Sequence, residues 1–133
     1  MTQISAPVSV GELLDKMSIL EIKSERIKDD AKLANVRREL EALETTWADS
    51  GLDRPELRPL RAELKKINEA LWEIEDFIRI KEAEGDFDQQ FIELARSVYF
   101  TNDKRAAVKR RINEAVGSEL VEEKSYADYT RPA

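Results

Sequence analysis

The chain has 133 residues, a length typical of one domain, with 28 acidic and 22 basic residues and a net charge of −6. This acidic balance disfavours a nucleic-acid backbone as the main partner, because phosphate binding requires a basic surface. The chain contains no cysteine and no histidine. These absences exclude disulfides, thiolate chemistry, the serine triad and nearly every zinc site.

The sequence indicates a cytoplasmic protein without a membrane segment. No apolar run approaches the ~20 residues that a helix needs to span a bilayer. The N-terminal stretch lacks the basic region followed by an apolar region that marks a signal peptide.

Two helices are predicted in the first part of the chain, near residues 9–28 and 30–49. Ser9 and Glu12 have the spacing of a capping box, so the first helix is expected to begin there. Apolar residues then recur at steps of three and four in both segments. Asp29 or Asp30 can cap the second helix, which favours a break between the two segments over a bend.

A long helical hairpin is predicted over residues 56–116, with helices at 56–84 and 87–116. The first of these carries a heptad seam, formed by Leu57, Leu60, Leu64, Ile67, Leu71, Ile74 and Ile78. A turn as short as Gly85-Asp86 requires the two helices to be antiparallel. The predicted fold is therefore all-α: a single helical domain, 1–133, built from N-terminal helices (9–49), a coiled-coil-like hairpin (56–116) and a tail (118–133).

The apolar seam of the last helix is interrupted by polar residues. Thr101 and Arg105 occupy inward positions between Val98 and Ile112, and Asn102 and Asp103 stand beside them. Antiparallel pairing around the turn places Arg105 near Ile67 on the opposite helix. The polar break is thus expected to lie close to three neighbours of Ile67, namely Asn68, Glu69 and Trp72.

Three interpretations of this break are open. A polar layer can fix the register of two helices at some cost in stability. Alternatively, the helix is interrupted and Asp103 caps a new helix beginning at Lys104. In the third interpretation the break is a binding pocket, in which Arg105 presents its donor fork to an anionic ligand while Glu69 and Asn102 orient it. The candidate ligand-binding residues are Arg105, Glu69, Asn102, Asp103, Asn68 and Trp72.

Arg105 is predicted to turn into the bundle and to donate hydrogen bonds to Glu69 or Asp103, because an unpaired buried charge costs several kcal/mol. If this pair is only structural, Arg105→Met is expected to leave stability nearly unchanged or to improve it, because an apolar residue restores the seam. Glu69, Glu73 and Asp76 share a helix face, but such carboxylates are usually solvated, so no metal or cofactor is predicted.

Several segments resemble a small bacterial family of single-domain proteins of unknown function. The similar segments are "VSVGELLDKMSILEIKSERI", "KLANVRRELEAL", "LWEIEDFIRIKEAEGDF", "FIELARSVYFTNDKRAAVKRRIN" and "GSELVEEKSY". This resemblance spans nearly the whole chain and implies no activity. A fainter likeness to the helical chorismate mutases lies in "LLDKMSILEIKSER". It implies cationic side chains converging inside a bundle, with Arg26 and Arg105 as the candidates.

Two functional hypotheses follow. The first is a non-enzymatic helical interaction or assembly module, which dimerises or docks a partner protein through its long helices. A homodimer is predicted because apolar residues outside the seam leave more surface than one thin hairpin can cover. The second is a small all-helical enzyme or binding protein for a phosphorylated or carboxylated metabolite, using Arg105 and Glu69. The sequence alone leaves open whether the protein is an enzyme.

Overall fold

Four helices follow one another in the computed structural model, which describes residues 2–130. They are α1 Val10–Arg26, α2 Asp30–Ser50, α3 Leu57–Glu84 and α4 Gln89–Val116. Residues 2–130 contain no strand. The predicted all-α fold is therefore confirmed. Of the predicted tail, residues 131–133 lie outside the described residues, and the part from 118 to 130 is called the tail below.

The helix ends follow the capping signals in the sequence. The Ser9 hydroxyl accepts a hydrogen bond from the Glu12 amide at 3.1 Å, and the Asp29 side chain accepts one from the Ala31 amide at 3.3 Å. Asp29 thus separates α1 from α2, as predicted. Gly85 ends α3 with φ +66°, a left-handed conformation that glycine adopts without strain.

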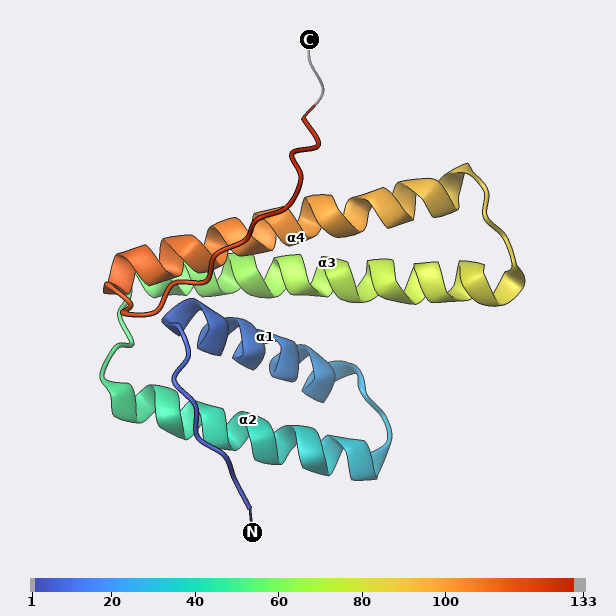
Figure 1. Cartoon of the computed structure of the whole chain (residues 1–133). Coiled ribbons are helices and arrows are strands. Elements are labelled where there is room, and N and C mark those ends of the chain that lie inside the picture. Colours follow the sequence, from blue (N-terminus) through green and yellow to red (C-terminus); the bar gives the residue numbers. More distant parts are fainter. Residues whose placement is uncertain (1, 131–133) are drawn as a thin grey trace.

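The four helices form two antiparallel pairs (Figure 1). One pair is the α3–α4 hairpin, and the other is formed by α1 and α2. Helix α1 packs against all three other helices, so it lies between α2 and the hairpin. The hairpin helices have 28 residues each and α1 has only 17, so the turn end of the hairpin extends beyond α1 (Figure 1).

The apolar core lies where α1 covers the hairpin. Its buried members are Leu14, Met17, Trp47, Leu57, Leu64, Val108 and Ile112. By contrast, every residue from 69 to 107 is exposed or only partly buried. The half of the hairpin near the turn therefore has no buried core of its own.

Helix α4 runs without interruption through the polar break in its seam. The interpretation in which Asp103 caps a new helix is therefore wrong. Residues 101–105 keep a helical backbone, and two of their polar side chains, Asp103 and Arg105, have hydrogen-bonding partners on other elements. Among residues 2–130, no helix is both long and apolar enough to cross a membrane.

Candidate functional site

Arg105 binds a carboxylate on α1, and the hairpin does not supply its partner. Its Nε donates to Oδ1 of Asp15 at 2.8 Å, and its Nη2 donates to Oδ2 of the same side chain. This two-pronged contact is the geometry in which a guanidinium binds a carboxylate most strongly. The hydrogen bonds to Asp15 raise the pKa of the Arg105 guanidinium. The Asp15 side chain is only 1% exposed, whereas that of Arg105 is 27% exposed, so the carboxylate is shielded from water and the guanidinium remains partly accessible.

Asp15 also joins α1 to α3 through Asn68. The Asn68 amide donates to Oδ1 of Asp15 at 2.9 Å and to the Ser18 hydroxyl at 2.7 Å. Ser18 in turn donates to the backbone carbonyl of Asp15 at 2.7 Å. Each of these buried side chains therefore has a hydrogen-bonding partner, and the network links three helices.

Lys109 lies one turn after Arg105, and its side chain is 7% exposed. Its Nζ donates to Glu12 at 2.7 Å and to Glu122 at 2.6 Å, and it lies 4.0 Å from Asp15. Burial lowers the pKa of Lys109, but the hydrogen bonds to Glu12 and Glu122 outweigh that effect and raise it. The two cations of this cluster thus face three carboxylates.

The tail has no helix or strand, yet it lies along α4 (Figure 1). Besides the contact of Glu122, Glu123 accepts a hydrogen bond from Arg110 at 2.7 Å. Nearer the end of the tail, Tyr129 donates a hydrogen bond to Asp103 and packs against Tyr99 and Phe100, with ring centroids 5.4 and 5.1 Å apart. Side-chain contacts therefore hold the tail in place.

A groove of about 680 Å³ lies between the tail and α4. Such a volume falls within the range of small-molecule sites. Tyr99, Tyr126 and Tyr129 line it, together with charged residues that include Arg105, Lys109 and Glu122. The groove thus combines aromatic surface with charges of both signs.

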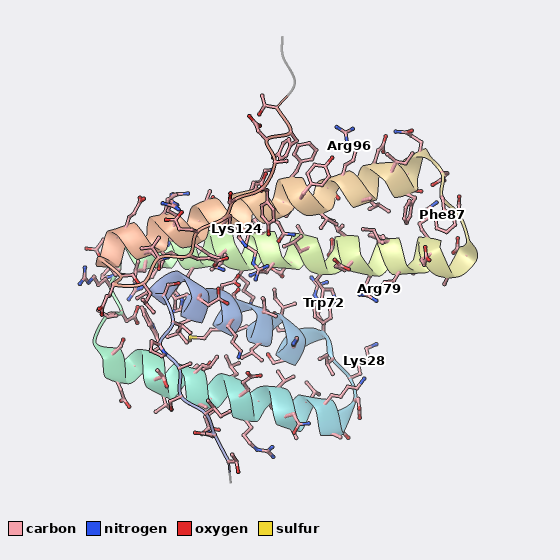
Figure 2. All side chains as sticks on the ribbon, in the orientation of Figure 1. Lys28, Trp72, Arg79, Phe87, Arg96 and Lys124 are labelled. Atoms are coloured by element: carbon pink, nitrogen blue, oxygen red, sulfur yellow. The ribbon has the colours of Figure 1, made fainter. Side chains whose placement is uncertain are left out.

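The structure brings together only part of the predicted ligand-binding set. Asn102 and Asp103 line the groove with Arg105, and Asn68 reaches the same cluster through Asp15. The other two members, Glu69 and Trp72, are absent from the residues lining the groove. Figure 2 shows Trp72 on the side of α3 turned toward the α1–α2 pair.

The predicted partners of Arg105 were wrong. Glu69 lies 3.8 Å from Arg26, and Asp103 accepts its hydrogen bond from Tyr129. The expectation assumed that the partner must come from the hairpin, whereas α1 covers this part of the seam. Arg26 is eleven residues beyond Asp15, about 16 Å along α1, so the two candidate arginines do not converge.

The sequence does contain a signal for Asp15. Gly11, Asp15, Ser18 and Ile22 are spaced by four, three and four residues, and all four are buried. This spacing places them in one row on α1. The first three members, Gly11, Asp15 and Ser18, are small or polar. Such residues beside an apolar stripe indicate a face that meets polar side chains, here those of Asn68 and Arg105.

Acidification is expected to release the tail. The hydrogen bond from Lys109, helped by Lys124, lowers the pKa of Glu122 from 4.5 to about 2. A carboxyl group with a depressed pKa stabilises the folded state above its unfolded pKa, and this contribution is lost as the pH falls toward 2. Amide NMR signals of residues 118–130 should therefore shift between about pH 4.5 and 2. In Glu122→Gln the tail should already be loosened at neutral pH. If the amide signals of this variant shift with pH as those of the wild type do, Glu122 is not the group whose protonation releases the tail.

A second feature is the distal hairpin, defined here as residues 69–98. It exposes four large apolar side chains, Phe77 (55%), Ile80 (52%), Phe87 (57%) and Ile92 (47%). Figure 2 shows Phe87 at the turn, beyond the end of α1. Glu73, Phe77, Ile80 and Glu84 are spaced by four, three and four residues, so they form one row on α3. That row combines exposed apolar surface with negative charge.

Residues 4–132 match the sequence model of a protein family of unknown function (DUF6165), so the chain belongs to that family. No curated protein and no solved structure matches the chain.

Proposed function

We propose that this member of the family is a non-enzymatic helical interaction module whose docking surface is the distal hairpin. One observation carries the proposal: from residue 69 to residue 107 the two longest helices contain no buried side chain. Most helical stability in proteins comes from packing an apolar face against a partner element. Near its base the distal hairpin contacts α1 through Arg26, which lies 3.8 Å from Glu69 and 3.6 Å from Glu73, but its turn end extends beyond α1 (Figure 1).

The exposed residues of the distal hairpin support the same function. Phe77, Ile80 and Ile92 lie about half exposed, although they belong to residue types that are usually buried. Clustered exposed apolar side chains mark interaction surfaces on proteins more often than scattered ones do. A helix laid against this end would cover them and complete a bundle.

A photo-crosslinking amino acid at position 77 tests the proposal in cells. We expect a discrete covalent adduct from position 77 and none from position 41, because Glu41 is exposed on α2, away from the hairpin. The mass of the adduct distinguishes a second copy from another protein. Absence of any adduct from positions 77, 80 and 92 contradicts the proposed function.

The predicted homodimer is the simplest assembly of this kind. Two copies meeting through the distal hairpin bring acidic residues together, so salt should promote the association by screening their repulsion. Light scattering at tens of micromolar should show a mass that rises from 15.3 kDa toward twice that value as salt is added. A monomer mass under all conditions contradicts the homodimer and leaves docking of a different protein.

Binding of a small phosphorylated or carboxylated metabolite is the second candidate function. It is favoured by the groove and by the free edge of Arg105, whose Nη1 has only a long contact of 3.5 Å with Asn102. The three carboxylates around Arg105 and Lys109 oppose it, because they already neutralise both cations. Glu69 has no part in this candidate site.

Thermal-shift measurements with phosphate and citrate test this second function. A stabilisation that disappears in Asn102→Ala, but persists when the exposed Lys104 is replaced by Gln, supports an anion site beside Arg105. No shift with either anion at millimolar concentration counts against it.

A further inference from the structure

The net charge of the chain is concentrated in the distal hairpin. Residues 69–98 contain nine acidic residues and three basic ones, a net charge of −6. The whole chain has 28 acidic and 22 basic residues, so the other 103 residues carry 19 of each and are neutral overall. The exposed apolar side chains therefore lie in an acidic segment, two of whose carboxylates, Glu69 and Glu73, face Arg26 of α1.

Two of the three cations of the distal hairpin form ion pairs within it. Lys81 donates to Asp86 at 3.0 Å and to Asp88 at 3.1 Å, which fastens the turn. Arg79 lies 3.7 Å from Glu75 on the same helix. In the described part of the chain, Asp76 and Glu84 take part in no ion pair.

Asp76 and Glu84 stand on either side of the exposed apolar pair. Phe77 and Ile80 are three residues apart on α3, and Ile80 is four residues from both Asp76 and Glu84. These spacings place all four side chains on adjoining rows of the helix surface. The surface therefore offers two apolar contacts bordered by unpaired negative charge.

We propose that the distal hairpin docks a basic amphipathic helix of a partner protein; this inference rests on the proposed function and names the class of partner. Such a helix seats apolar residues spaced by three and four against Phe77 and Ile80. Its lysines and arginines then approach Asp76, Glu84 and the other carboxylates of the segment. Charge complementarity of this kind accelerates association and excludes partners of the wrong sign.

Charge decides between this partner and a second copy of the chain. A second copy meeting the same surface places a charge of −6 against another of −6, whereas a basic helix neutralises it. Bringing like charges together costs free energy, so the surface favours a partner of opposite charge. A basic helix is therefore the better occupant, and self-association is the weaker use of the surface.

Fluorescence anisotropy with a labelled helical peptide of leucine and lysine tests the inference on the full chain. Three peptides are compared: the amphipathic Leu/Lys peptide, a scrambled peptide of the same composition, and an amphipathic Leu/Glu peptide. We expect the first to bind, the second to bind at least about tenfold more weakly, and the third not to bind. Affinity for the first peptide should also fall as salt is added.

Two pairs of substitutions on the protein locate the site. The double variant Phe77→Ser with Ile80→Ser should weaken binding of the Leu/Lys peptide about tenfold or more. Its control is Leu120→Ser with Val121→Ser, at similarly exposed positions on the tail, which should leave binding unchanged. Asp76→Asn with Glu84→Gln should weaken binding and flatten its salt dependence. The matched control is Glu41→Gln with Glu44→Gln on the exposed face of α2. All these side chains are exposed, so the variants are expected to fold.

Equal binding of the scrambled or the Leu/Glu peptide overturns the inference, as does equal weakening by the control substitutions. If no peptide binds but position 77 still forms a crosslinked adduct, the interaction module stands and the basic helix is excluded. If neither peptide binding nor crosslinking is seen, both proposals fail.

Discussion

Replacing Asp15 by alanine is expected to lower the free energy of unfolding by about 3–5 kcal/mol, the usual cost of removing one partner from a buried ion pair. The carboxylate accepts hydrogen bonds from Arg105 and Asn68, and its side chain is 1% exposed. Without this carboxylate, the Arg105 guanidinium loses both of its hydrogen bonds to α1. The Asn68 amide also loses one of its two acceptors. Urea unfolding followed by tryptophan fluorescence, to which buried Trp47 and partly buried Trp72 contribute, measures the loss.

A double substitution distinguishes the effect of the two charges on stability from the effect of the volume that the two side chains fill. Asp15→Leu with Arg105→Met removes both charges and leaves apolar side chains of similar volume, an exchange that is often neutral or stabilising. Arg105→Met alone should be destabilising, because it leaves the Asp15 carboxylate buried without the guanidinium. This revises the expectation from the sequence that Arg105→Met is neutral or stabilising, which rested on an apolar residue restoring the seam of α4. A loss of less than about 1 kcal/mol in Asp15→Ala contradicts a structural role for the pair.

The architecture was predictable because local signals and periodicity agree. The hydroxyl of Ser9 caps α1 as its spacing from Glu12 indicates, and Gly85 ends α3 where the heptad seam stops. The short turn then leaves antiparallel packing as the only arrangement for α3 and α4. Each of these inferences uses residues within a few positions of one another, and each therefore needs no knowledge of the other helices.

The partner of Arg105 was not predictable in the same way, because it depends on which helix covers the polar break. Arg105 and Asp15 are 90 residues apart. Pairing rules within the hairpin identify Asn68 correctly as a neighbour but exclude α1 from consideration. The contact of Glu122 with Lys109 was missed for a related reason. The tail has no periodicity, so nothing in its sequence indicates where it lies.

The close approach of α1 and α4 depends on a residue that the sequence presents only as part of a helix start. Gly11 donates its amide hydrogen to Oδ1 of Asn113 at 2.6 Å. Since Gly11 and Asp15 occupy the same row on α1, this contact lies one helical turn from the Asp15–Arg105 pair. Because Gly11 has no side chain, α1 can lie close enough to α4 for Asp15 to reach Arg105.

Gly11→Ala is accordingly expected to destabilise the protein by about 2 kcal/mol, even though alanine favours helix by up to about 1 kcal/mol. A Cβ at this position meets the backbone carbonyl oxygen of Lys109 at 2.6 Å and Asn113 Oδ1 at 3.1 Å. The nearer atom belongs to the backbone, so α1 and α4 must move apart to relieve the contact. Adding Asn113→Ala should therefore fail to restore stability.

The same movement should lengthen the contact between Asp15 and Arg105. In the Gly11→Ala background, Asp15→Ala should then cost measurably less than in the wild type, and a double-mutant cycle with urea unfolding gives the coupling energy. Additive losses would show that the glycine and the ion pair act independently. A Gly11→Ala protein as stable as the wild type would show that the two helices can part without loss, and that close packing at Gly11 does not hold the buried pair together.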